Sequence, residues 1–381
     1  MAFKIGGYTD SDGNDGHAPL SAMVVANYTH VSGDLTDVPK HFHDNNNAAL
    51  QEMSAFLAGR LTDHVGSFTQ VTYSDIDRKT AMDNMDIRAA MDVNGTIVGV
   101  SFNNNPGVTD PLDTLPVWRF PYTSPDLGGS GPSAAPVLDD ALGGTVIGAN
   151  VYAYTDTGIY GEAGLYRSLS QSQLDRLNVE PGQKLSSPAG YWRLAYIRDL
   201  HKQSFSLGLV GMNARLRDYD STGPSDSYND IGVDAGYQFL GTRQHICTLN
   251  LTYIHEKQDL NAAFANGDAG RKNGNLNQLA LTTSYYFANT YGFTARYFAT
   301  GGSTDPVRYS GGKPDSNGYL LQADWTPFGK EDSWQAPWAN VRLGLQYIGY
   351  GKIDGTRRNY DGNGRDASDD NTLSLFLWSS I

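Results

Sequence analysis

The sequence predicts an all-β protein, a transmembrane antiparallel β-barrel of about 16 strands with long extracellular loops and short periplasmic turns. Three observations lead to this prediction. Apolar and polar residues alternate with a period of two over segments of about 9–11 residues, the length that a tilted membrane strand needs. Tight and long connections alternate along the chain. No apolar run of about 18 residues, which a membrane helix would need, is present, and the mean hydropathy is −0.43.

The strands are predicted where one parity is apolar and the other is polar or small. In residues 339–347, for example, the residues Ala339, Val341, Leu343, Leu345 and Tyr347 alternate with Asn340, Arg342, Gly344 and Gln346. Counted along the chain, the predicted strands are 18–31, 48–61, 65–75, 83–94, 96–104, 143–154, 158–168, 189–199, 203–217, 228–239, 244–256, 275–287, 291–300, 317–326, 338–349 and 371–381.

The connections sort by length. Those after even-numbered strands are mostly tight, as at Asn94–Gly95, Asp156–Gly158, Gly241–Gln244 and Ala288–Thr290. Asn-Gly and similar pairs adopt the positive φ that short hairpins need. Those after odd-numbered strands are mostly long and polar: 32–47, 169–188, 257–274, 301–316 and 350–370. This alternation is the plan of an outer-membrane barrel, so we expect the first and last strands to begin and end on the periplasmic side.

The segment "NTLSLFLWSSI" (371–381) is predicted to be a strong apolar strand, with Leu373, Leu375 and Leu377 on one face. In a soluble β-sandwich, such a strand is usually covered by another element, or charged side chains on it prevent pairing with other chains. A closed barrel instead pairs its last strand with its first. We therefore expect residues 371–381 to pair with the first strand and to face lipid.

The connection at 105–142 is rich in proline and glycine, and it is too long to serve only as a link between two strands of a compact domain. We expect it to fold into the lumen as a constriction loop; a solvated surface loop or lid is the alternative. Its acidic residues would make a constriction favour cations. These residues are Asp110, Asp113, Asp126, Asp139 and Asp140.

Charged residues within the strands share one parity, which identifies the lumen face because such charges are costly against lipid. The predicted pore-lining residues are Glu52, Arg60, Asp86, Arg88, Asp92, Glu162, Arg193, Asp234, Arg296, Asp324 and Arg342. Their mixed signs allow a salt-bridge lattice or a water-filled pore. Inward glycines such as Gly232 and Gly236 are expected to leave open space. The single cysteine, Cys247, shares parity with lipid-facing leucines, and no disulfide or thiolate zinc cluster can form.

Aromatic residues near the short connections are expected to form a girdle at the headgroup level. These residues are Phe287, Tyr291, Phe293, Trp325, Phe328, Trp334 and Trp338.

Other motifs point to no chemistry within the chain. "HFHDNN" (41–46) lacks a third fixed metal ligand, and "DSDGND" (10–15) and "DGNGRDASDD" (361–370) depart from calcium-loop spacing. No G-x-S-x-G elbow and no C-x-x-C-H haem attachment motif is present. We therefore expect no catalytic, metal or cofactor-binding residues and no enzyme activity. No signal peptide opens the chain, so we expect either that one was cleaved or that the N-terminus was trimmed and Met1 added. The net charge of −13 argues against nucleic acid as a partner.

Several phrases together resemble one known family, the bacterial outer-membrane fused monohaem cytochrome–porins, which include iron oxidases. The phrases run in order along most of the chain: "FKIGGYT" (3–9), "NNNAALQEMSAF" (45–56), "FTQVTY" (68–73), "DNMDIR" (83–88), "GYWRLA" (190–195), "KPDSNGY" (313–319) and "RNYDGNGRDASDDNTL" (358–373). In that family a short segment with C-x-x-C-H precedes the barrel. The resemblance implies a barrel that holds a haem c segment and passes electrons between an extracellular donor and periplasmic carriers. None of the family's haem ligands maps onto this chain.

Three hypotheses follow for the function. The first is the barrel part of a cytochrome–porin electron conduit, whose haem c would come from an upstream C-x-x-C-H segment. The second is a passive, cation-preferring diffusion porin without haem. The third is a soluble extracellular β-rich binding protein. The first two place the chain in the outer membrane of a Gram-negative bacterium, with membrane lipid, detergent and small ions or solutes as partners, and periplasmic electron carriers as further partners of the first.

Overall fold

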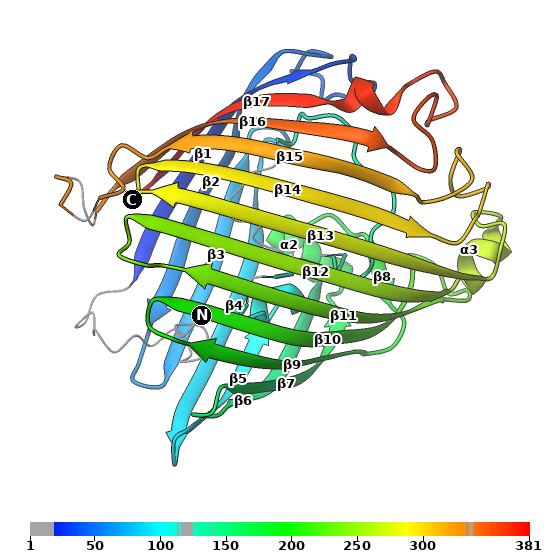
Figure 1. The fold of residues 1–381 in the computed structure, drawn as a ribbon. Helices are drawn as coiled ribbons and strands as arrows, with labels where there is room; N and C mark the ends of the chain where they lie inside the picture. The colour runs from blue at the N-terminus through cyan, green and yellow to red at the C-terminus, as the bar shows by residue number, and fades with distance from the viewer. Residues whose placement is uncertain (1–18, 113, 116–124, 140, 331, 335–337) are drawn as a thin grey trace.

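A computed structural model describes residues 19–112, 114–115, 125–139, 141–330, 332–334 and 338–381. It is a closed barrel of antiparallel strands with long loops at one end and short turns at the other (Figure 1). The membrane strands are β1 (Leu20–Val31), β2 (Asn47–Arg60), β3 (Val65–Ser74), β4 (Lys79–Val93), β5 (Thr96–Asn103), β6 (Val146–Tyr154), β7 (Ile159–Ser168), β9 (Ala189–Asp199), β10 (Gln203–Asp218), β11 (Asp226–Phe239), β12 (His245–Asp259), β13 (Asn273–Phe287), β14 (Tyr291–Gly302), β15 (Ser316–Trp325), β16 (Asn340–Lys352) and β17 (Thr372–Ser380).

The barrel closes where the first strand meets the last. β1 pairs with β17 in antiparallel register, with Val25 opposite Trp378, and its other edge pairs with β2. Every membrane strand therefore has two neighbours, and no backbone edge is left to face lipid. The predicted fold class, a 16-strand antiparallel barrel with long loops and short turns, is confirmed.

The remaining elements lie in the loops. The short strand β8 (Gln183–Leu185) pairs with the end of β10, beside β9. Among the described residues, the helices are α2 (Gln171–Leu177), α3 (Asn261–Asn266) and the 3-10 turns η1 (Pro106–Thr109) and η2 (Ala367–Asp370). No helix among the described residues is both long and apolar enough to span a membrane.

Two connections differ from the expected length pattern. β4 begins at Lys79, earlier than the predicted residue 83, because residues 79–82 continue the pairing with β3 through a β-bulge. The connection at the long-loop end is therefore the tight turn 75–78. At the other end, residues 326–339 form a longer connection than the other turns there. The turn at Asn94 (φ 54°) and Gly95 (φ 82°) has the positive φ values of a two-residue hairpin, as predicted.

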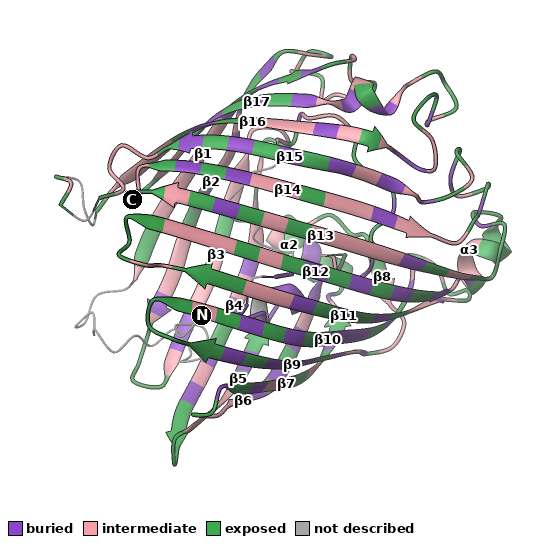
Figure 2. Ribbon diagram, viewed as in Figure 1, coloured by how far each residue is buried: buried purple, intermediate pink, exposed green. Residues whose placement is uncertain are grey.

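The alternate apolar residues of each strand face the outside of the barrel. On β17, Leu373, Leu375 and Leu377 are exposed on the outside, whereas Ser374 and Phe376 are buried on the inside. Figure 2 shows the same alternation on strand after strand. In the predicted girdle, Phe328 is half-buried, and the exposed residues are Phe287, Tyr291, Phe293, Trp325, Trp334 and Trp338.

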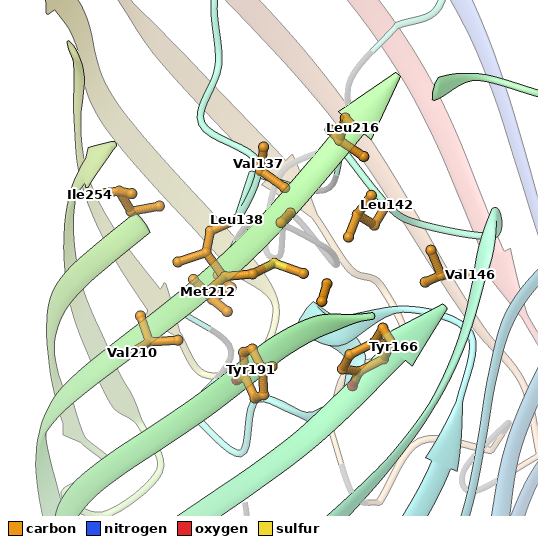
Figure 3. Packing of buried hydrophobic residues seen from close by; sticks show 13 residues of the cluster. Val137, Leu138, Leu142, Val146, Tyr166, Tyr191, Val210, Met212, Leu216 and Ile254 are labelled. Atoms are coloured by element: carbon orange, nitrogen blue, oxygen red, sulfur yellow. The ribbon is translucent and has the colours of Figure 1, made fainter. Parts of the chain in front are cut away.

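The apolar core lies inside the barrel, on one half of its inner wall. Val210 and Met212 of β10 and Ile254 of β12 face inward and are almost fully buried. They pack against Val137 and Leu138 of the loop between β5 and β6 (Figure 3). This loop, residues 104–145, is called the inner loop below. An apolar inner wall needs such a cover, because it would otherwise face water.

Carboxylates also tie neighbouring loops together at the long-loop end. Asp305 accepts hydrogen bonds from the backbone N–H of Gly270 at 3.0 Å and of Val307 at 3.1 Å. Burial alone would raise the pKa of Asp305, but these backbone donors outweigh it and hold that pKa below its ordinary value. The carboxylate therefore stays anionic while it joins residues 260–272 to residues 303–315.

Candidate functional site: the lumen and its inner loop

The inner loop enters the lumen directly after β5 and is shaped first by Asp110. The Asp110 carboxylate accepts the backbone N–H groups of Leu112, Thr114 and Leu115 at 2.9–3.0 Å. Asp110 is itself only 1% exposed. A buried carboxylate of this kind folds the chain around itself, because each backbone donor would otherwise lose its partner.

Arg193 of β9 connects this part of the loop to the wall. Its guanidinium lies 2.6 Å from the Asp234 carboxylate of β11 and 3.1 Å from that of Asp110, and all three side chains are buried. Thr252 of β12 adds a hydrogen bond of 2.8 Å to the Thr114 carbonyl. A buried arginine between two carboxylates is strongly coupled to both, because water does not screen their charges.

A second anchor holds the returning part of the loop. Val137 N–H donates to Glu256 and Leu138 N–H donates to Asp230, each at 2.8 Å. Glu256 and Asp230 face inward from the neighbouring strands β12 and β11. The wall thus uses two carboxylates as acceptors for backbone N–H groups that are buried in the lumen.

The middle of the inner loop reaches the opposite wall. Gly129 N–H donates to the Thr372 hydroxyl of β17, and Ser130 N–H donates to the Asp370 carboxylate, both at 2.8 Å. The loop therefore crosses the lumen and is fixed on both sides. The described residues 125–139 of the segment predicted as a constriction loop or a surface loop thus contact both sides of the barrel.

The wall of β4 to β7 carries another buried polar cluster. Asp86 accepts hydrogen bonds from Arg88 at 2.5 Å and from Ser101 at 2.6 Å. Glu162 accepts from Asn150 and from the Tyr160 hydroxyl. All of these residues are almost fully buried, so on this side of the barrel the inward charges form a packed lattice.

Inward residues that keep solvent contact lie on β2 to β4 and on β13 to β17, and others lie near the short turns of β10 to β12. They are half-exposed and mostly polar or aromatic. Among the described residues of β2 to β4 and β13 to β17, this set includes Glu52, Phe56, Phe68, Asp83, Gln278, Thr282, Tyr286, Arg296, Arg342 and Trp378. The larger half-exposed side chains of β2 to β4 and β13 to β17 are therefore concentrated on one side of the lumen, away from the core under the inner loop. We call this side of the lumen the lateral passage.

The structure divides the predicted pore-lining residues into three groups. Glu52, Arg296 and Arg342 lie on the lateral passage, and Arg342 is 2.9 Å from buried Asp324. Arg60 and Asp92 lie near the short turns, where Arg60 pairs with Asp63 and Asp92 accepts the Gly95 N–H. The other predicted residues are buried: Asp86, Arg88, Glu162, Arg193, Asp234 and Asp324.

The described acidic residues of the inner loop lie in different environments. Asp110 is neutralised by Arg193 and does not face the passage. Asp139 is half-buried and accepts a hydrogen bond from Gln278, and Asp126 is exposed. Asp113 and Asp140 lie outside the described residues.

The inward glycines do not leave open space, contrary to the expectation from sequence. A Cβ on Gly232 would meet Val210, and one on Gly236 would meet the Ser206 hydroxyl. Aromatic rings cover other glycines: Tyr166 lies over Gly148, and Phe376 lies over Gly344. Side chains of the neighbouring strand occupy the space over these glycines, so no open space is left along the wall there.

A cavity of about 780 Å³ lies at the short-turn end. Its lining includes Phe56, Tyr286, Arg342 and Trp378, together with Met23 of β1. Arg342 lies over the rings of Phe376 and Trp378 at 5.6 Å and 3.1 Å from the Tyr286 hydroxyl. We call this cavity the vestibule.

Within the described residues, no group of three or more histidine, cysteine or acidic side chains could hold a metal ion. His41 of the "HFHDNN" segment instead contacts the Asp75 carbonyl. Arg365, at a ligand position of the calcium-like segment, binds Asp370 with two hydrogen bonds from Nε and one from Nη2. Residues 10–15 lie outside the described part.

Sequence reasoning missed four lumen carboxylates and amides that matter here: Asp230, Glu256, Gln70 and Asp83. Asp230 and Glu256 share parity with inward Asp234 and Thr252, so parity alone could have identified them. Gln70 and Asp83 lie at an irregularity in the β3–β4 pairing, which alternation does not reveal.

Solved structures with a similar fold include a porin and an outer-membrane channel. The anion-selective porin from Comamonas acidovorans is 11% identical with a TM-score of 0.53, covering 95% of this chain and 98% of that one. Salmonella typhi OmpF, solved with daunomycin, is 10% identical with a TM-score of 0.54, covering 95% and 97%. The channel DcaP of Acinetobacter baumannii is 13% identical with a TM-score of 0.52, covering 98% and 99%. No family model and no curated protein matches the chain.

At these identities the likeness concerns the fold. The closed barrel and the apolar outer wall independently require a bilayer around the strands. The predicted location, the outer membrane of a Gram-negative bacterium, is confirmed by this combination.

Proposed function

We propose that the chain is a porin-type channel, through which small ions and solutes diffuse passively along the lateral passage, with a preference for cations. The observation that carries this proposal is the uneven filling of the lumen. One half is a packed core under the inner loop, and the other half keeps a lining of half-exposed polar residues. A lining of this kind lets hydrated ions pass, and its charges set which ions enter.

The inner loop is suited to narrow such a channel without moving. Its anchors are the Arg193 cluster, the acceptors Asp230 and Glu256, and the hydrogen bonds to Thr372 and Asp370. A loop fixed on both sides gives the passage one width, so we expect steady current levels. The net charge of −13 favours cations near the mouths.

Conductance of the refolded chain in a planar bilayer tests this proposal. We expect stepwise insertions of constant size and, in a KCl gradient, a reversal potential on the cation side. Heat-denatured protein at the same concentration is the control and should give no steps. A silent membrane with correctly folded protein would overturn the channel function, and anion preference would overturn the selectivity.

A second candidate function is the barrel part of a cytochrome–porin electron conduit. The resemblance of the phrases quoted above supports it, and so does the vestibule. A cavity of about 780 Å³ has the size of a cofactor site. Its lining offers a thioether, aromatic rings and an arginine, which are residue types that would contact a haem iron, its porphyrin and its carboxylates.

If an upstream segment supplies haem c, Met23, Phe56, Trp378 and Arg342 are the residues that would hold it. The haem would supply a one-electron carrier, and periplasmic electron carriers would be the partners at this end. The aromatic residues would exclude water from the group, and Arg342 would offset its carboxylates.

Purification of the natural gene product from its own membranes tests this candidate. We expect covalently bound haem that remains with the polypeptide after denaturation, and a C-x-x-C-H motif encoded directly upstream of the barrel. A natural product without haem would leave the diffusion channel as the function.

A further inference from the structure

One group of polar side chains on the lateral passage has more acceptors than donors. Ser54 Oγ donates to Glu52 at 2.6 Å and lies 2.9 Å from Thr72 Oγ1, which donates to Asp83 at 3.1 Å. Gln70 Nε2 lies 2.9 Å from Glu52. We call this set, Glu52, Ser54, Gln70, Thr72 and Asp83, the acceptor cluster.

Two β-bulges aim the carboxylates of this cluster into the lumen. In β2, Gln51 has no partner in β1, so Gln51 and Glu52 both turn inward. In β4, Asp83 and Asn84 together face Gln70. Each bulge adds one side chain to the inner wall that regular alternation would place against lipid.

The cluster lacks a cation of its own. Within the described part of the chain, neither Glu52 nor Asp83 forms a salt bridge, whereas Asp86, Asp234 and Asp324 each have an arginine. The Gln70 side-chain oxygen makes no hydrogen bond although Gln70 is only 4% exposed. Gln70 Nε2 donates to Glu52, Ser54 and Thr72 and so faces the cluster, whereas its oxygen points to the other side of the amide. The site therefore contains two carboxylates without a cation and, at its edge, a buried amide oxygen without a hydrogen bond.

Carboxylate, amide and hydroxyl oxygens are the ligands of hard cations such as K⁺ and Mg²⁺. The inner loop passes close by, because the Asp126 N–H lies 3.4 Å from Gln51 Oε1, next to Glu52. Ions that pass beside this contact would therefore come near the cluster.

We propose that the acceptor cluster is a cation-binding station on the lumen wall and that Glu52 and Asp83 decide the cation preference of the channel. This inference rests on the proposed diffusion channel and assigns its selectivity to β2 and β4, in place of the acidic residues of the inner loop. The ligand class is hydrated alkali and alkaline-earth cations.

The first test compares ion selectivity of the double variant E52Q/D83N with that of the unaltered chain in planar bilayers. We expect the K⁺ to Cl⁻ permeability ratio to fall to about 1, with conductance steps still present. The matched control is D77N/D156N, which removes two exposed carboxylates from turns and should leave the ratio unchanged. A double variant that keeps the original ratio, or an unaltered channel without cation preference, would overturn the inference.

The second test does not depend on conductance. Carboxyl groups of the folded barrel are labelled with a soluble carbodiimide and an amine, with and without Mg²⁺, and mapped by peptide mass spectrometry. We expect Mg²⁺ to protect Glu52 and Asp83 and to leave Asp77 and Asp156 unprotected. Equal labelling with and without Mg²⁺ at all four would overturn the station. A silent membrane together with protection would overturn the channel function alone.

Discussion

At the scale of residues, most lumen charges of this barrel serve structure. Arg193 is fully buried between Asp110 and Asp234, and Arg88 is fully buried beside Asp86. Removing one member of such a group leaves its partners charged and unscreened, which costs far more than losing an exposed pair. The inward arginines therefore do not all contribute to ion selectivity.

Replacing Arg193 tests this distinction. We expect R193Q to destabilise the folded barrel by about 3–5 kcal/mol, because Asp110 and Asp234 would remain buried without a cation. Current noise should increase as the inner loop loses an anchor. The free energy of unfolding in urea with lipid vesicles and single-channel recordings measure the two effects.

The control is R60Q, since Arg60 pairs with the largely exposed Asp63 near the short turns. Its cost should stay below about 1 kcal/mol. Equal destabilisation by both variants would contradict the assignment of Arg193 as an anchor.

At the scale of elements, glycine on one strand makes room for an aromatic ring on the next. Gly148 of β6 lies directly opposite Tyr166 of β7, and the Tyr166 ring covers the position that a Cβ would take. The Tyr166 hydroxyl also lies 2.9 Å from the Asn150 side-chain amide and joins the buried lattice. Pairing of β6 with β7 thus depends on a residue without a side chain.

The substitution G148A tests whether β6 needs a glycine opposite Tyr166. We expect G148A to destabilise the barrel by about 1–3 kcal/mol, because the Tyr166 ring must leave its place in a packed wall. G161A is the matched control on β7, where an added Cβ meets nothing within 4 Å. Urea unfolding of both variants measures the difference, and an unaffected G148A would show that the ring can move freely.

At the scale of the whole molecule, the barrel encloses an apolar core that belongs partly to a loop. Leu138 and Leu142 of the inner loop pack against Met212, Leu216 and other wall residues. The wall of a simple aqueous pore would be polar. We therefore expect the inner loop to stabilise the fold as well as to narrow the proposed channel.

Shortening the inner loop tests this view. Replacing residues 127–139 by a short Gly-Ser linker should widen the channel and also destabilise it, since each buried apolar side chain contributes about 1.5–3 kcal/mol. Conductance and urea unfolding are measured together. The control replaces α3 (Asn261–Asn266), which has no buried residue and should change neither. A wider channel of unchanged stability would mean that the loop is only a lid.

By itself, the sequence determined the barrel. Alternation with a period of two identifies which side chains of a strand face lipid, and loop lengths identify the two ends of the barrel. Both signals come from residues that are neighbours in the sequence, so they do not require the tertiary structure. The pairing of 371–381 with the first strand follows from the need to leave no edge in lipid. The lumen face of Asp86, Asp234 and Asp324 follows from the same parity.

Only the tertiary structure decided what the lumen contains. Parity places Arg193 and Asp234 inside, but it cannot show that Asp110 meets them from a loop, since that contact joins residues far apart in sequence. The bulges that turn both Gln51 and Glu52, and both Asp83 and Asn84, inward break the alternation on which sequence reasoning depends. Which charges remain open to water is therefore a property of packing across the barrel, where the inner loop covers one half of the wall.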